Sequence, residues 1–220
     1  MPETIQFGTF PVFFSADSQC RLLPPYPART KLPHWVRRQA GQMQANDPAG
    51  QAGTLAASGP FLKTITQGFI IPAPFDFHID LQMPDDGEAI FPQKLPKDID
   101  PEQYEFWAPF PDGHMTKQIA GSPWENAPWV IKLRGFWYIE TPPGYSCLFM
   151  APQKLTGENL PFYALPGIVE TDRYKNLISF PMIPQHSFPM VVPGGTPLVQ
   201  VIPFKRSDWN SEIRCLDDEA

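Results

Sequence analysis

Prolines recur along the whole chain instead of gathering in one tract. There are 29 among 220 residues, well above the usual share of roughly 5%. Proline lacks a backbone N–H and its ring clashes with the preceding helical turn, so long helices are not expected. Aromatic residues make up 13% of the chain, which supplies ample apolar mass for a packed core. The sequence therefore predicts a folded, loop-rich and mainly β protein with few short helices.

A chain of this length suits one sizeable core. We expect a proline-rich N-terminal arm over residues 1–58 and a β-rich core domain over residues 59–220. Within the arm, residues 33–46 start with a proline and carry one apolar edge, which predicts a short surface helix. The Gly-rich residues 47–60 predict a flexible connector.

Charge and cysteine content restrict the classes of partner. The net charge of -6 disfavours non-specific binding to nucleic acid, which needs clustered basic side chains. The chain has no basic leader and no run of about 18 apolar residues, so we expect a soluble, cytoplasmic protein without membrane contact. Its cysteines are odd in number and widely spaced, and we interpret all three as free thiols: Cys20, Cys147 and Cys215.

Alternating apolar and polar residues predict an antiparallel set of strands from residue 60 onward. The expected strands lie at 61–75, 76–83, 129–140, 145–150, 167–171, 176–183, 188–192 and 197–204. Turn residues separate several of them, as at Pro142–Gly144 and Pro193–Gly195. Ser207 is a candidate N-cap of a short terminal helix.

Three of these stretches resemble, in order and in strand-turn rhythm, the β-clip core of the dUTP pyrophosphatase and dCTP deaminase superfamily: "GYSCLFMAPQ", "GIVETDRYKNLISFPM" and "GTPLVQVIPF". The segment Gly167–Asp172 follows the hairpin motif of that family, and Gln200 stands where its late strand carries a glutamine. The resemblance implies a β-clip-like fold, a homo-oligomer for which a trimer is conceivable, and Glu170 as the carboxylate that polarises water. The phosphate-gripping Pro-Arg-Ser of the family is replaced by Ala151–Lys154. Glu170 and Asp172 have the alternative role of capping the hairpin.

A longer stretch, residues 59–206, is similar to an uncharacterised family of bacterial and tailed-phage proteins. The similarity rests on "GPFLKTITQGFIIPAPFD", "PWVIKLRGFWYIETPPGYSCLFMAP", the Glu170 hairpin and "GTPLVQVIPFKR". This resemblance implies no reaction for any residue.

A separate pattern suggests metal chemistry. His78 and Asp80 are two positions apart and so share one face of a strand. Together with the distant His186, they match the two-histidine, one-carboxylate triad that holds non-haem iron. Arg206 could then bind the carboxylate of a 2-oxo acid co-substrate through both guanidinium nitrogens.

Three hypotheses about function follow. The favoured one is a non-enzymatic ligand-binding or assembly protein, because no nucleophile elbow, phosphate loop or dinucleotide fingerprint occurs in the sequence. Aromatic clusters at 104–110 and 136–138 would pack in the core or contact a subunit or ligand, a small molecule or a protein. The alternatives are an iron-dependent oxygenase that uses the His78 triad, and a dUTP pyrophosphatase-like hydrolase that uses Glu170.

Overall fold

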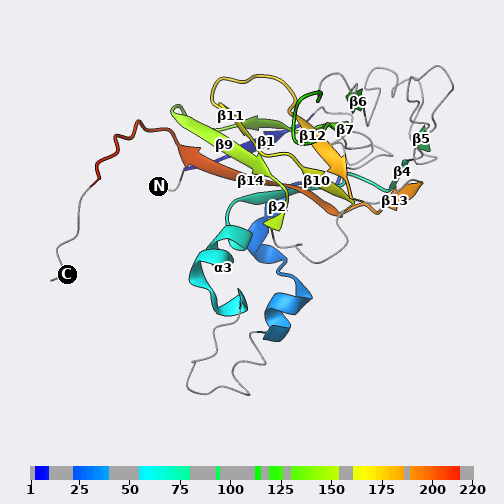
Figure 1. The fold of residues 1–220 in the computed structure, drawn as a ribbon, viewed down its shortest axis with the longest axis horizontal. Coiled ribbons are helices and arrows are strands. Elements are labelled where there is room, and N and C mark those ends of the chain that lie inside the picture. Colours follow the sequence, from blue (N-terminus) through cyan, green and yellow to red (C-terminus); the bar gives the residue numbers. More distant parts are fainter. Residues whose placement is uncertain are drawn as a thin grey trace.

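The computed structural model describes residues 3–9, 22–39, 55–79, 93–94, 112–114, 119–125, 130–153, 161–185 and 189–213. Within these residues the chain is mainly β, and its strands pair antiparallel in sheets of two, three, four and five strands (Figure 1). This confirms the predicted mainly β class with short helices, and it is consistent with a β-clip-like arrangement. No helix in the described part is long and apolar enough to cross a membrane.

The largest sheet has the strand order β11-β9-β14-β3-β2. Its members are β11 (Gly167–Val169), β9 (Tyr145–Met150), β14 (Pro197–Lys205), β3 (Phe69–Pro72) and β2 (Tyr26–Pro27). The proline-rich segment of the N-terminal arm thus supplies an edge strand, β2, as is common for proline in sheets.

β14 lies at the centre of that sheet. It pairs with β9 from Gln200 opposite Met150 to Lys205 opposite Tyr145, and with β3 on its other side. Four consecutive residues, 198–201, are buried. Burial of consecutive residues means that both faces of this strand are covered, as expected for a central strand.

The other sheets are smaller. The four-stranded sheet has the order β10-β12-β7-β6, the three-stranded sheet β13-β4-β5, and β1 pairs with β8. Their bounds are β10 (Phe162–Ala164), β12 (Ser179–Pro184), β7 (Val130–Arg134), β6 (Asp112–His114), β13 (Met190–Val192), β4 (Phe77–Ile79), β5 (Gln93–Lys94), β1 (Gln6–Gly8) and β8 (Tyr138–Glu140).

One hydrophobic cluster joins the four sheets. Each sheet contributes a buried isoleucine to it: Ile71 from β3, Ile79 from β4, Ile131 from β7 and Ile139 from β8. Burying side chains of this size stabilises a fold by about 1.5–3 kcal/mol each. The sheets therefore share one core and fold together.

A second, smaller cluster lies where the helical segments meet, at the bottom of the view in Figure 1. Val36 from the helical residues 34–39, Ala56 from η2 (Leu55–Ala57) and Ile65 from α3 (Gly59–Thr66) are buried together. The cluster joins residues on both sides of the expected boundary at residue 58, which stays a prediction.

The strand prediction for residues 61–75 is wrong in its first half, where α3 stands instead. Ser58 caps this helix, because its hydroxyl accepts a hydrogen bond from the Phe61 amide at 3.4 Å, and Pro60 occupies the first turn. Phe61 and Ile65 are four residues apart, and both pack into the small cluster. Residues 55–57, 59 and 60, predicted as part of the connector, are helical as well. Ala56 packs into the same small cluster as Ile65.

The single strand predicted over residues 129–140 is two strands, β7 and β8, in different sheets. The break occurs at Gly135, where a Cβ would lie 2.0 Å from the carbonyl oxygen of Ile178. Only a glycine permits this close approach of two backbones. The alternation within the second half is nevertheless correct, since Trp137 is buried whereas Tyr138 is half-buried.

Where they fall on described residues, the remaining strand predictions are confirmed to within a few residues in β4, β9, β11, β12, β13 and β14. The short helix predicted over residues 33–46 is present at 34–39. The terminal helix expected after Ser207 is wrong for residues 207–213, which form neither helix nor strand, since a short helix without a packed face is unstable in water. The aromatic cluster at 104–110 lies outside the described residues.

Candidate functional site

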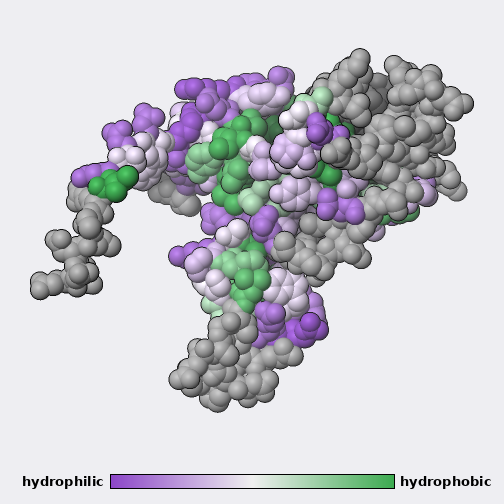
Figure 2. Space-filling view, viewed as in Figure 1, coloured by the Kyte–Doolittle hydropathy of each residue, from purple (hydrophilic) through white to green (hydrophobic). Residues whose placement is uncertain are grey.

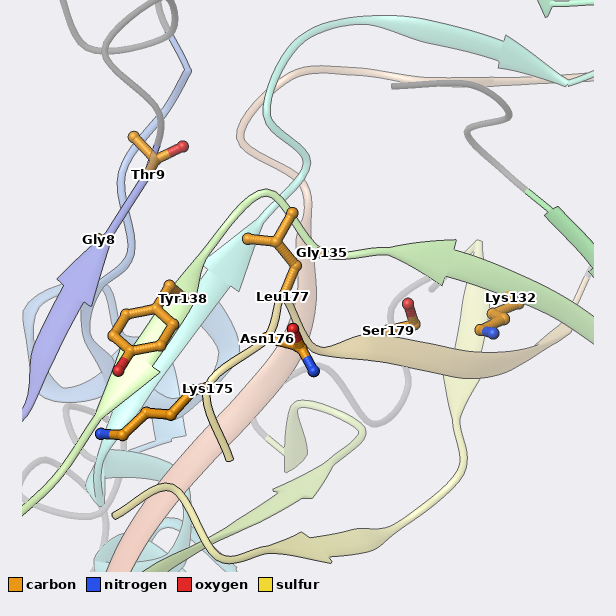
Figure 3. Close-up of a pocket in the computed structure, with 9 residues that line it drawn as sticks. All are labelled: Gly8, Thr9, Lys132, Gly135, Tyr138, Lys175, Asn176, Leu177 and Ser179. Atoms are coloured by element: carbon orange, nitrogen blue, oxygen red, sulfur yellow. The ribbon is translucent and has the colours of Figure 1, made fainter. Parts of the chain in front are cut away.

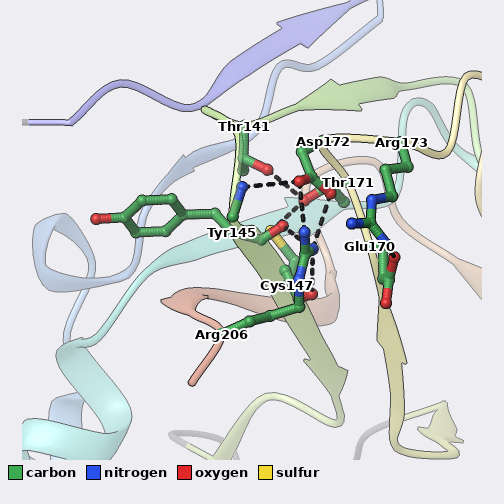
Figure 4. Close-up of polar contacts among 10 residues, drawn as sticks. Thr141, Tyr145, Cys147, Glu170, Thr171, Asp172, Arg173 and Arg206 are labelled. Atoms are coloured by element: carbon green, nitrogen blue, oxygen red, sulfur yellow. Dashed lines mark hydrogen bonds and ion pairs between the residues drawn. The ribbon is translucent and has the colours of Figure 1, made fainter. Parts of the chain in front are cut away.

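The hairpin that follows β11 is tied to the rest of the core by Asp172 and Arg206 (Figure 4). The Arg206 guanidinium donates from Nη2 to Asp172 Oδ2 at 2.5 Å and from Nη1 to Oδ1 at 2.8 Å. Nη1 also donates to the Tyr145 carbonyl oxygen at 2.7 Å and to Ser146 Oγ at 3.0 Å. The Gly144 amide donates to Asp172 Oδ2 at 2.8 Å. Asp172 thus bridges the β11 hairpin, the turn before β9 and the end of β14.

These contacts favour the charged forms of both Asp172 and Arg206. Hydrogen bonds from Arg206 hold the pKa of the Asp172 carboxyl well below its usual range, and the Gly144 amide adds to the effect against the opposing cost of burial. The Asp172 side chain is 7% exposed and that of Arg206 is 25% exposed. The guanidinium that the iron hypothesis assigns to a co-substrate carboxylate is therefore engaged by a carboxylate of the same chain.

Glu170 lies two residues earlier, on the outer side of the same turn. Its Oε2 accepts a hydrogen bond from Arg173 Nη1 at 2.8 Å, and the two side chains are 48% and 71% exposed. The Glu170 carbonyl oxygen also accepts the Arg173 and Tyr174 amides at 2.9 and 2.8 Å, which closes the turn. A shallow depression of about 470 Å³ begins here, lined by these three residues with Ile168 and Val169.

The contacts separate the two carboxylates that the sequence places together. Asp172 is internal and fully hydrogen-bonded, whereas Glu170 faces solvent beside a cation and a depression. An exposed ion pair such as Glu170–Arg173 contributes little to stability. Glu170 is therefore the carboxylate of this hairpin that an external ligand can reach.

Beneath the hairpin lies a buried polar trio. The hydroxyls of Thr141 and Thr171 are 2.7 Å apart, and Thr171 Oγ1 donates to Cys147 Sγ at 3.4 Å. Burial raises the pKa of the Cys147 thiol, against the opposing effect of the Thr171 hydrogen bond. Cys147 is a free, buried thiol and suits packing better than nucleophilic attack. Cys20 and Cys215 lie outside the described residues.

Gln200, which the resemblance singled out, is fully buried in β14. Its Nε2 donates to the carbonyl oxygens of Thr64 and Gln67 at 2.7 and 2.9 Å. Its Oε1 accepts from the Gln153 amide at 3.3 Å. The side chain therefore fixes the C-terminal end of α3 and the segment after β9 against the central strand, and this arrangement leaves it no contact with solvent.

Of the three residues in the iron hypothesis, the structure describes only His78. His78 is half-buried in β4, opposite Val191 of β13 and Lys94 of β5. Asp80 and His186 lie outside the described residues, so their distance from His78 is not defined. Among the side chains that the structure describes, no group of three His, Cys, Asp or Glu residues lies close enough to hold a metal ion. The triad stays a prediction.

Sequence reasoning missed the Asp172–Arg206 pair and the buried threonines. The pair joins positions 34 residues apart, and no spacing rule links them.

A search with protein-family models finds no match, and neither does a search of curated proteins. Among solved structures the chain is similar to the native dUTPase of EIAV, with a TM-score of 0.33 and 12% identity over 70% of this chain and 85% of that chain. No residue role is carried over from that likeness.

Proposed function

We propose that this protein is a non-enzymatic assembly protein that forms a homo-oligomer through its C-terminal arm, defined as residues 207–213. The observation that carries the proposal is the exposure of two large apolar side chains on this arm. Trp209 is 88% exposed and Ile213 is 100% exposed. Membership of the bacterial and tailed-phage family named above is part of the same proposal.

The arm continues from the end of β14 and runs away from the sheets (Figure 1). In the space-filling view, green hydrophobic atoms appear near the end of the coloured part of the arm, beside purple and white residues (Figure 2). Tryptophan is enriched among the residues that dominate binding at protein interfaces. An arm that exposes Trp209 and Ile213 to solvent therefore has the composition of a segment that binds another protein surface.

The same chain also exposes an apolar patch to which such an arm could bind. β11 is an edge strand of the five-stranded sheet, and its Ile168 is 65% exposed beside Tyr174 at 41%. Edge strands carry unpaired backbone groups that favour pairing with another chain. Glu170 and Arg173 provide a charged rim around this apolar patch. We therefore assign a second copy of this chain as the partner, with its arm on the Ile168 face.

Light scattering coupled to size-exclusion chromatography tests this proposal. We expect the unaltered chain to have the mass of a closed oligomer, for which a trimer fits the resemblance. Trp209→Ser combined with Ile213→Ser should weaken association about 30-fold, because an interface tryptophan contributes about 2 kcal/mol. Leu55→Ser, which removes a 53% exposed leucine from η2, is the matched control. A monomer at all concentrations, or an unaffected double variant, would contradict the proposal.

Nucleotide hydrolysis is a second candidate, supported by the exposed Glu170 carboxylate beside its depression. Incubation with dUTP and dCTP in the presence of Mg²⁺, followed by measurement of released pyrophosphate or ammonia, tests it. Activity that Glu170→Gln abolishes would establish this candidate, whereas inactivity toward both nucleotides would exclude it.

The iron-dependent oxygenase stays a third proposal, which rests on the sequence pattern alone. Metal analysis of iron-reconstituted protein tests it directly. About one iron per chain, lost in His78→Ala, would support it, and an equal iron content in both proteins would contradict it.

A further inference from the structure

The helical lobe, defined as η1 (Ala28–Thr30), the helical residues 34–39, η2 and α3, lies in a basic part of an acidic chain. Residues 22–68 contain a single acidic residue, Asp47, whereas the whole chain has 23 and a net charge of -6. The same residues contain five basic side chains: Arg29, Lys31, Arg37, Arg38 and Lys63. The lobe projects below the sheets in Figure 1. Salt screens exposed charges beyond about 10 Å at 0.1 M, so the local charge of the lobe governs its contacts.

Contacts among the helical segments fix which side of each segment faces water. Trp35 packs on α3, where its ring centre lies 5.8 Å from that of Phe61. Val36 is buried in the small cluster, and Gln39 accepts a hydrogen bond from an amide of η2 at 3.4 Å. η1 contacts α3 as well. Trp35, Val36 and Gln39 therefore form the inner side of the helix at 34–39.

The outer side of that helix is basic. His34, Arg37 and Arg38 are three and four residues apart, which places them on one helical face, and all three are exposed. Arg29 on η1 and Lys63 on α3 are exposed too. Clustered cations attract counter-ions, and a polyanion that replaces these counter-ions gains free energy from their release.

Three basic side chains on the sheets are bound to carboxylates instead. Lys175, at the edge of the depression drawn in Figure 3, donates to Glu140 Oε1 at 2.7 Å. Arg173 and Arg206 bind the two carboxylates of the β11 hairpin. Within residues 22–68, Asp47 lies outside the described part and balances at most one cation. The basic excess is therefore a property of the lobe and not of the sheets.

The outer surface of the lobe also indicates the class of polyanion. Protein interfaces have an apolar centre, but among the described residues of the lobe Leu55 is the one large apolar side chain that is exposed. Single-stranded nucleic acid stacks its bases on accessible aromatic rings, whereas Trp35 and Phe61 pack against each other. Contacts to the backbone of a duplex need exposed cations and little apolar surface. Arginine suits them because its guanidinium binds phosphate through two parallel N–H groups.

We propose that the helical lobe binds the phosphate backbone of double-helical nucleic acid, without reading its sequence. Arg37 and Arg38 form the centre of the contact, and Arg29 and Lys63 extend it. This surface is separate from the C-terminal arm and from the Ile168 patch, so the inference does not rest on the assembly role.

Fluorescence anisotropy of a labelled DNA duplex of about 20 base pairs, titrated with the full chain at several salt concentrations, tests the proposal. We expect binding that weakens steeply as salt rises. Arg37→Gln combined with Arg38→Gln should lower the slope of log K against log salt by about 2, because one phosphate contact is lost with each arginine. Affinity at low salt should fall about tenfold or more. Arg37→Lys combined with Arg38→Lys should retain the slope, because the charge is kept.

Lys175→Gln combined with Lys205→Gln is the matched control, because it removes the same charge from exposed positions on the sheets. It should leave the salt slope unchanged. Equal losses in the two glutamine double variants would overturn the location of the contact, and so would an unchanged slope in the arginine variant with its Tm retained.

A single strand that binds more tightly than the duplex would overturn the choice of a double helix. Absence of binding at low salt would overturn the proposal as a whole. If the arginine variant then also had a lower oligomeric mass, the face would belong to an acidic surface of a second copy instead.

Discussion

Arg206 grips the carboxylate of Asp172 through both terminal guanidinium nitrogens, although the two residues are 34 positions apart. The contact joins the end of β14 to the β11 hairpin, next to the start of β9, in the five-stranded sheet. A bidentate pair of this kind fixes orientation as well as distance. It therefore sets the direction in which the hairpin presents Glu170 to solvent.

The Asp172–Arg206 pair should make stability depend on acid pH. Arg206 lowers the pKa of Asp172 in the folded protein, so the pair contributes fully above the unfolded pKa of about 3.9 and loses its contribution as pH falls below that value. We expect the Tm of the unaltered chain to fall from pH 5 downward. Asp172→Asn should lower the Tm at pH 7 by several degrees and flatten this dependence. Scanning calorimetry measures both, with Glu170→Gln as the exposed control, and an unchanged Tm at pH 7 would contradict the assignment.

Gln200→Leu should destabilise the fold by about 2 kcal/mol. The leucine keeps the apolar volume but leaves the carbonyl oxygens of Thr64 and Gln67 without their donor. Urea denaturation followed by circular dichroism gives the free energy of unfolding. Gln185→Leu is the control, because Gln185 is exposed and donates to the nearby Ile183 carbonyl, and it should stay within about 0.5 kcal/mol. Equal effects of the two substitutions would contradict a structural role for Gln200.

Gly68→Ala should be among the most damaging single substitutions. Gly68 has φ +70° and a Cβ there would lie 2.0 Å from the Val201 carbonyl oxygen. Strain and collision together should cost about 3 kcal/mol or more. Gly121 has a similar φ of +75° but open space around its Cβ position, so Gly121→Ala should cost only about 1 kcal/mol. Similar unfolding free energies for the two variants would show that the close approach is relieved at little cost.

Ser58→Ala should loosen α3. Loss of the capping hydrogen bond to the Phe61 amide typically costs about 1 kcal/mol, and Ser58→Asp should restore most of it. Hydrogen exchange over residues 59–66 reports the change locally. Protection that stays the same in Ser58→Ala would mean that packing of Ile65 in the small cluster holds the helix without its cap.

Local patterns allowed part of the fold to be predicted correctly. Strand alternation located β12, because successive side chains of a strand point to opposite faces. Short apolar runs bounded by turn residues located β9 and β14. The Pro-Gly turn at Gly195 requires positive φ, which is +85° in the structure and is available mainly to glycine. The scattered prolines, which break helices wherever they occur, were sufficient to predict the mainly β class.

The candidate sites depended on tertiary structure. Residues 61–66 alternate weakly enough to suit a strand, and they form a helix because the arm helix at 34–39 offers an apolar partner for Ile65. Gly135 divides one apparent strand in two because the Ile178 backbone crosses close to it. Asp172 meets Arg206 only because strands distant in sequence become neighbours.

The sequence alone determined that this chain would be a strand-rich fold with short helices, since proline placement and residue alternation act within a few positions of each residue. Only the tertiary structure decided which charges are neutralised and which stay available. Whether a carboxylate or an ammonium group is paired depends on neighbours brought together across the sheets, as Asp172 with Arg206, and no local pattern encodes that distance.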